Sequence, residues 1–172
     1  MKLKRSDIKV LVEQLSKYAS ATHPKVSYFV SVNALRARKC LDEADALTAV
    51  GWPTEAWNAW LKASREVAEA HAQRDEKDAI VWLDVPNVPG GKRMSIVDVD
   101  AFNAEIAELQ KEHPQAMSDA AAHDARVAEI WASEDEFREH RLSAQVAADA
   151  GVLTAETLAY LMRLGLIEDD EN

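Results

Sequence analysis

The 172-residue sequence is poor in the residues that mark disulfide-rich, loop-rich or membrane proteins: it has one cysteine, five glycines and five prolines. The single cysteine, Cys40, excludes an internal disulfide and a site built from several thiolates. No apolar run approaches the roughly 18–20 residues that a membrane-spanning helix needs, and the N-terminal residues contain no apolar signal-peptide segment. We therefore expect a globular, intracellular protein with no membrane association.

Charge is present in excess and is unevenly distributed. Residues 1–40 carry nine Lys/Arg against two Asp/Glu, a net charge of +7, whereas residues 41–172 carry eleven against twenty-eight, a net charge of −17. One interpretation is that both regions are solvated surfaces, which bear on solubility more than on fold. The other is that the two ends support head-to-tail self-association or docking on two unlike surfaces.

Apolar residues recur at helical spacing along most of the chain, and the predicted fold class is therefore mostly α. We expect about six to seven helices in a bundle with one inserted β-hairpin. Ser133 and Glu136 have the spacing of a capping box, which predicts that the sixth helix begins there and ends at Gly151. Thr154 is expected to cap the last helix. The predicted organisation is a single helical domain over 1–172, with a hairpin at about 79–99 and an acidic tail at 168–172.

The hairpin prediction comes from two segments rich in β-branched residues, AIVWLDVPNV at 79–88 and KRMSIVDV at 92–99, which flank Pro89-Gly90-Gly91. Pro86 indicates that the first strand is short or lies at an edge. Alternation places Trp82 and Val85 on opposite faces, so both faces carry large apolar side chains. The hairpin is therefore either buried on both sides or an interaction arm.

Candidate catalytic and metal-binding groups are sparse. His113, His123, Asp124 and Asp149 nominally match the residue types of an HD-type phosphohydrolase, whose imidazoles and carboxylates bind divalent metals. Two Glu-x-x-Glu pairs, at 66–69 and 105–108, have the spacing of carboxylates that hold Mg²⁺, although solvated helix charges are the plainer interpretation. The sequence assigns no catalytic residue, no metal ligand and no cofactor.

The basic N-terminal forty residues are the only candidate for contact with phosphate groups. Arg36, Arg38 and Lys39 are the charged positions that we single out there, because clustered cations neutralise phosphates. The strong acidity of the remaining chain argues against the wrapping of a nucleic-acid duplex. These three residues are instead a second candidate surface for a protein partner.

Three stretches together resemble a family of small, uncharacterised tailed-bacteriophage proteins from structural and morphogenesis gene clusters. They are KVSYFVSVNALRARKCLDEADALTA at 25–49, DAFNAEIAEL at 100–109 and LTAETLAYLMRLGLI at 153–167. The resemblance carries no catalytic residues. It implies a phage origin, a location in the host cytoplasm or the virion, and a binding or assembly role.

The functional expectation is a non-enzymatic phage protein that acts by protein–protein contact or self-association, as a minor virion or tail-associated component or as an assembly factor. The predicted partner-binding residues are Trp82, Val85 and Met94 in the hairpin, with Arg36, Arg38 and Lys39 second. One alternative is an acidic inhibitor of a host enzyme or defence system. The other is the metal-dependent HD-type phosphohydrolase.

Overall fold

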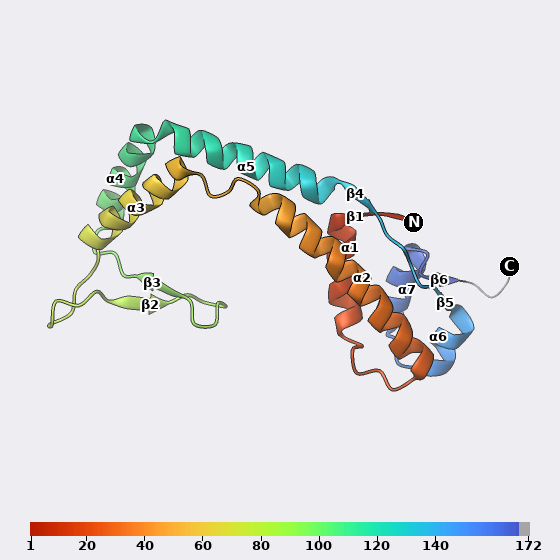
Figure 1. Ribbon diagram of the computed structural model, residues 1–172. Helices are drawn as coiled ribbons and strands as arrows, with labels where there is room; N and C mark the ends of the chain where they lie inside the picture. The colour runs from red at the N-terminus through yellow and green to blue at the C-terminus, as the bar shows by residue number, and fades with distance from the viewer. Residues whose placement is uncertain (169–172) are drawn as a thin grey trace. The chain divides into compact units, whose positions relative to one another are not determined.

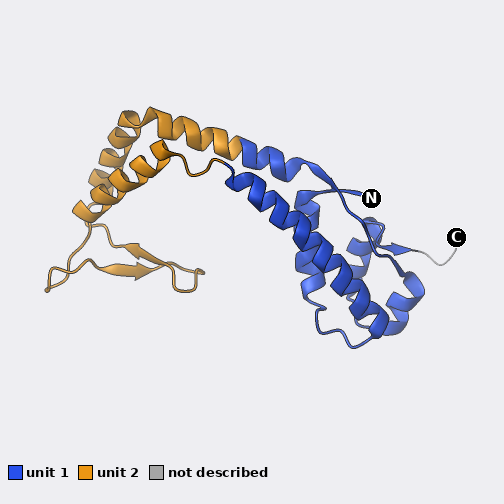
Figure 2. Cartoon of the chain, viewed as in Figure 1, with its two compact units in different colours: residues 1–50, 126–172 blue, residues 51–125 orange. Residues whose placement is uncertain are grey.

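The computed structural model describes residues 1–168, in which α-helices predominate and short strands occur in pairs (Figure 1). The mostly α fold with a hairpin is confirmed. The chain divides into two compact units (Figure 2). The single helical domain over 1–172 stays a prediction. Unit 1 comprises residues 1–50 and 126–172, and unit 2 comprises residues 51–125. Part of the predicted acidic tail, 169–172, lies outside the described residues.

Unit 1 combines four helices, the end of a fifth and two small strand pairs. Its elements are β1 (Lys2–Lys4), α1 (Arg5–Ser16), α2 (Pro24–Ala49), the end of α5 (Pro114–Ala132), β4 (Glu134–Glu136), β5 (Leu142–Ser143), α6 (Ala144–Ala150), α7 (Ala155–Arg163) and β6 (Ile167–Glu168). β1 pairs antiparallel with β4, and β5 pairs parallel with β6.

The core of unit 1 lies between α1, α2 and the C-terminal helices, because each of these helices has an apolar stripe at three- and four-residue spacing. Its largest fully buried side chains include Phe29, Phe137, Ile8, Leu11, Leu15, Leu161 and Leu166. Thr154 caps α7 by accepting a hydrogen bond from the backbone N–H of Thr157, as the sequence predicted. Gly151, with φ +61°, ends α6 in the left-handed conformation that glycine adopts without strain.

The predicted capping box at Ser133 and Glu136 is wrong. Glu136 lies in β4, and the Ser133 hydroxyl instead donates to the carbonyl of Ile130 at the end of α5. The next helix, α6, begins only at Ala144. The local pattern is overridden because residues 134–136 form backbone hydrogen bonds with β1, a segment about 130 positions away in sequence.

Unit 2 contains α3 (Glu55–Ala70), β2 (Trp82–Asp84), β3 (Lys92–Met94), α4 (Val99–Glu112) and the beginning of α5. α3 packs against α4, and Asp98 caps α4 by accepting a hydrogen bond from the backbone N–H of Ala101. Within this fully described unit, only the two alanines Ala72 and Ala116 are buried. Its large apolar side chains are half-buried or exposed, so unit 2 has little core of its own.

Half-buried aromatic rings supply much of the packing in unit 2. Trp52, Trp57 and Trp60 form a continuous series with ring-centroid distances of 5.1 and 4.7 Å, and His123 stacks on Trp52 at 4.2 Å. Such contacts add roughly 0.5–1.5 kcal/mol each beyond area burial. The tryptophans at 52, 57 and 60 are therefore accounted for by packing, whereas Trp82 takes no part in this series.

Candidate interaction site

The hairpin β2–β3 exposes three large apolar side chains of unit 2, Trp82, Leu83 and Val88. Its register places Trp82 opposite Met94, Leu83 opposite Arg93, and Asp84 opposite Lys92. The connecting turn is closed by two backbone hydrogen bonds, from Val88 N–H to the Val85 carbonyl and from Gly91 N–H to the Val88 carbonyl. Both strands lie within the predicted segments, although Trp82 is the only aromatic or β-branched residue among their six.

The two faces of the hairpin carry different side chains. Trp82 and Met94 lie directly across from each other and share one face, while Val85 falls on the opposite face with Leu83 because side chains alternate along a strand. Trp82 is 47% exposed and Leu83 41% exposed, whereas Met94 and Val85 are half-buried. The structure therefore joins two of the three predicted hairpin residues and separates the third.

Further exposed apolar residues surround the hairpin, and the sequence-based prediction did not select them. Val88 in the turn is 53% exposed, and Val97 after β3 is 72% exposed. A hairpin buried on both sides would show neither value. Of the two interpretations that the sequence left open, burial on both sides is wrong within the described chain, and the hairpin presents apolar side chains on both of its faces.

The base of the hairpin is fixed by backbone hydrogen bonds to the segment that follows α3. Gln73 N–H donates to the Ser95 carbonyl at 2.7 Å, and the Gln73 carbonyl accepts from Val81 N–H at 2.8 Å. The Ser95 hydroxyl reinforces this pairing by donating to the Gln73 side-chain oxygen at 2.9 Å. The hairpin is thus attached at its open end, and its strands and turn project beyond that attachment.

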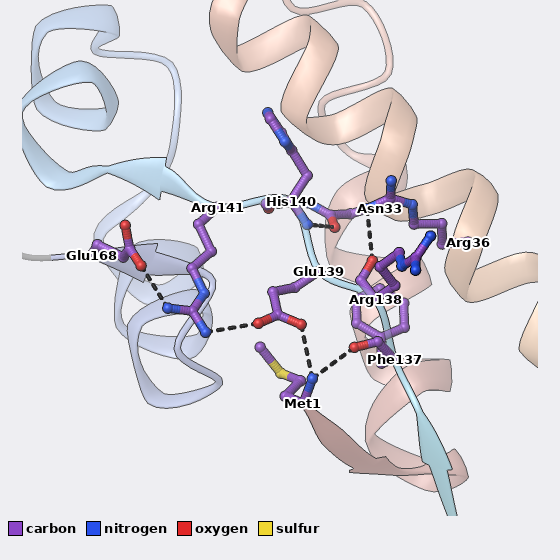
Figure 3. Close-up of polar contacts among 9 residues, drawn as sticks. All are labelled: Met1, Asn33, Arg36, Phe137, Arg138, Glu139, His140, Arg141 and Glu168. Atoms are coloured by element: carbon purple, nitrogen blue, oxygen red, sulfur yellow. Dashed lines mark hydrogen bonds and ion pairs between the residues drawn. The ribbon is translucent and has the colours of Figure 1, made fainter.

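The second predicted surface, on α2 of unit 1, is partly used for internal contacts. Arg36 donates from its guanidinium to the Arg138 carbonyl at 2.7 Å (Figure 3), and Lys39 lies 3.9 Å from the carboxylate of Glu43. Arg38 is exposed. A groove of about 260 Å³ beside them is lined by Arg36, Lys39, Arg138, Cys40, Phe137, Glu43 and Glu136. Its three cations are offset by two carboxylates, so positive charge is not concentrated there.

Three of the nine Lys/Arg of residues 1–40 lie beside acidic residues of β4 in unit 1. Lys2 lies across from Glu136 and Lys4 across from Glu134 in the β1–β4 ladder. Arg5 forms a two-pronged contact with Asp135, with both N–O distances at 2.8 Å. This pairing weakens the argument that the charge division serves head-to-tail assembly, because opposite charges directly across a strand pair are an intramolecular source of stability.

A polar segment that the sequence did not reveal runs from Phe137 to Arg141 (Figure 3). The Met1 amino group donates to the Phe137 carbonyl and to the Glu139 carboxylate, both at 2.8 Å. The hydrogen bond from that amino group, followed by one from the Glu139 backbone and one from Arg141, lowers the pKa of Glu139 to about 2. Arg141 also binds Glu168 at 2.6 Å.

Asn33 fixes the middle of this segment to α2. Its side-chain carbonyl accepts from His140 N–H at 2.9 Å, and its amide donates to the His140 carbonyl at 2.8 Å (Figure 3). The side chain of Asn33 is fully buried. The only sequence signals for this region were the alternating Lys-Leu-Lys of 2–4 and Glu-Asp-Glu of 134–136, which match as complementary strands.

The residues proposed for metal chemistry do not gather. Within residues 1–168, no group of three or more His, Cys, Asp or Glu side chains is arranged to hold a metal ion. His123 stacks on Trp52, and its Nδ1 lies 3.7 Å from the Asp124 carboxylate, which is 85% exposed. Burial is the largest influence on Cys40 and raises the pKa of its thiol, which favours the unreactive protonated form.

Comparison with protein-family models, curated proteins and solved structures finds no match for this chain. In the described part of the chain, no helix combines the length and apolarity that crossing a bilayer requires. The candidate site consequently rests on geometry alone: an exposed, two-faced apolar hairpin on a unit that buries little of its apolar surface.

Proposed function

We propose that this protein is a non-enzymatic bacteriophage protein that acts by binding a protein partner through the hairpin of unit 2. Its role is that of a minor virion or tail-associated component or of an assembly factor, in the host cytoplasm or the virion. The observation that supports binding is the exposed pair of faces on β2–β3, with Trp82 at 47% exposure and Val88 at 53%. The phage context comes from the resemblance of three sequence stretches and is part of the proposal.

The physical argument is the position of the apolar surface. Aromatic residues and methionine are enriched at the centres of protein interfaces, and Trp82 and Met94 lie directly opposite each other on one face. An isolated two-stranded hairpin is marginally stable in water, so further contacts would stabilise it. A partner that covers Trp82 and Met94 would remove this surface from water and supply those contacts.

The test uses tagged full-length protein in the phage-infected host. Trp82→Asp and Met94→Asp are expected to lose the captured phage protein, because a charge would replace an apolar contact. Leu61→Asp is the matched control, since Leu61 is 44% exposed on α3 of the same unit and lies outside the hairpin. Helical circular dichroism should stay at the wild-type level in all three variants. Unchanged capture by both hairpin variants would refute the proposal.

A second candidate function is inhibition of a host enzyme or defence system through an acidic surface. Unit 2 carries fourteen Asp/Glu against seven Lys/Arg, a net charge of −7, which favours a basic partner. Such a complex should weaken steeply between low and high salt, because exposed charges are screened over a Debye length of about 8 Å at physiological ionic strength. A complex that tolerates high salt but is lost in Trp82→Asp would favour the first function.

A further inference from the structure

The hairpin has two open edges, because β2 and β3 form a two-stranded sheet with no third strand in the described chain. Ser95 N–H donates to the Val81 carbonyl, and Val85 N–H donates to the Gly91 carbonyl, both at 2.9 Å. Antiparallel pairs alternate between hydrogen-bonded and non-hydrogen-bonded positions. The backbone groups of Trp82 and Asp84 therefore point away from β3, toward the outer edge of β2.

The two edges differ in charge. β3 carries Lys92 and Arg93, and lysine at an edge is a common protection against strand pairing. If two β3 strands paired about Arg93, two guanidinium groups would lie directly opposite each other, which is destabilising. β2 contains Trp82, Leu83 and a single carboxylate, Asp84, which lies 3.5 Å from the Lys92 ammonium of its own hairpin. The β2 edge is the one open to another strand.

We propose that the occupant of the β2 edge is the β2 strand of a second copy of this chain, paired antiparallel about a two-fold axis at Leu83. In this register, Trp82 of each copy faces Asp84 of the other. These are the residues whose backbone groups point outward, so the two strands form hydrogen bonds in both directions. Two hairpins would then become one four-stranded sheet. A sheet needs three or more strands to be stable in water, and an isolated hairpin has only two.

The side chains are self-complementary in the same register. Leu83 faces Leu83 of the second copy, and Val81 faces Val85, so one surface of the central strands becomes a continuous apolar ladder. No two like charges lie directly opposite, because Asp84 faces Trp82. This is an isologous contact, in which the same residues serve both copies and the assembly closes as a dimer. The contact is small, and we expect a weak, concentration-dependent dimer, because interfaces below about 1,200 Å² are typical of transient complexes.

This inference rests on the proposed function, because it names a partner for the same hairpin. The proposed function concerns the hairpin face that carries Trp82 and Met94, whereas this inference also specifies the outer backbone edge of β2. Substitutions that affect one edge and not the other can therefore test it. A proline at position 84 removes an outward N–H of β2 without removing a hydrogen bond between β2 and β3. A proline at position 92 does the same on the outer edge of β3. Both substitutions also break the Asp84–Lys92 ion pair, so Lys92→Pro is a matched control for Asp84→Pro.

Sedimentation velocity of the purified full chain measures the outcome. We expect a concentration-dependent dimer for the wild type and for Lys92→Pro, and at least about tenfold weaker dimerisation for Asp84→Pro, which loses the same donor twice in a two-fold contact. A wild-type chain that stays monomeric through hundreds of micromolar would overturn the inference. Equal dimerisation by Asp84→Pro and Lys92→Pro would also overturn it.

Cross-linking keeps the test decisive if both prolines disturb the hairpin. In a Cys40→Ala background, Leu83→Cys should form an interchain disulfide on mild oxidation, because the paired Cα atoms of a non-hydrogen-bonded position lie about 4.5 Å apart. Arg93→Cys, at the equivalent position of β3, should not. Equal cross-linking of the two variants refutes pairing at β2. If the chain is monomeric but Trp82→Asp still loses the captured phage protein, self-pairing is wrong and the proposed function stands. Unchanged capture by both Trp82→Asp and Met94→Asp refutes the proposed function itself.

Discussion

Replacement of Asn33 is the sharpest test of how unit 1 is held together. The Asn33 amide makes three hydrogen bonds: two with the backbone of His140, and a third, at 3.1 Å, to the Phe29 carbonyl of its own helix. Its side chain has no exposure to solvent. It therefore pairs with residue 140 as a neighbouring strand would, although it lies on a helix.

The magnitude follows from the two groups that lose their partner. Asn33→Ala leaves the N–H and the carbonyl of His140 unpaired, and an unsatisfied buried polar group costs about 1–3 kcal/mol. The Phe29 carbonyl lies in the α2 helix and loses only a second donor. Because water can reach His140 in part, we expect a decrease of about 2–4 kcal/mol in the free energy of unfolding.

Asn33→Asp tests the direction of each hydrogen bond. The new carboxylate can still accept from His140 N–H, but it faces two carbonyl oxygens at the positions where the amide donated. Burial and these oxygens should raise its pKa above the unfolded value of about 3.9. A raised folded pKa means that destabilisation is smallest below about pH 4. As the pH rises further, the destabilisation grows by about 1.4 kcal/mol per pH unit until the pH reaches the pKa of the new carboxylate in the folded state.

Urea unfolding followed by helical circular dichroism measures both effects. Asn103→Ala, an exposed position on α4, serves as the control and should change stability by less than about 0.5 kcal/mol. A loss below about 1 kcal/mol for Asn33→Ala would contradict the reasoning, because it would mean that His140 finds other partners. A pH-independent deficit in Asn33→Asp would contradict the assignment of the donor and acceptor atoms.

Three further predictions concern the remaining contacts. Arg5→Lys should lower the free energy of unfolding by about 1–2 kcal/mol in urea titrations, since an ammonium cannot reproduce the two-pronged contact with Asp135; full stability would show that the fork geometry is unimportant. The pKa of Glu139 is lowered to about 2, so its contribution to stability is fully present above the unfolded pKa of 4.5 and is lost as the pH falls toward 2. Glu139→Gln should therefore reduce the fall in thermal unfolding temperature between pH 4.5 and 2. An unchanged fall would assign the acid sensitivity to other carboxylates. Amide hydrogen exchange should be faster in α3 and α4 than in α1 and α2, because unit 2 buries only two alanines; equal protection would refute the view that the units differ in core.

The helices and the hairpin were predictable because their determinants are local. Thr154 caps the helix that follows it, and the β-branched segments around Pro89-Gly90-Gly91 form the hairpin inside its predicted range. Each of these features depends on a few neighbouring residues, which sequence periodicity and capping preferences report directly. The selection of Trp82 as an apolar residue on the hairpin surface followed from the same alternation.

The candidate site was predictable only in part. Val85 lies on the face opposite Trp82 and Met94, and the prediction grouped all three because it did not fix which face a partner would use. The sequence showed correctly that residues 1–40 are basic and the remainder acidic, but it did not show which charges meet. The structure places Lys2, Lys4 and Arg5 beside Glu136, Glu134 and Asp135, so part of the charge division serves contacts within unit 1.

The sequence by itself determined the helical class, the cap of α7, the position of the hairpin and its two apolar faces. Each of these is set by residues within a few positions of one another. Only the tertiary structure decided that residues 134–136 form a strand with 2–4, that Asn33 pairs with His140, and that the chain folds as two units. Those outcomes depend on pairs more than 100 positions apart or on how apolar surface is shared among elements, and local pattern carries no record of either. The open β2 edge depends on both the sequence and the tertiary structure. The sequence predicted where the hairpin lies, and the hydrogen bonds between β2 and β3 showed which backbone groups point outward.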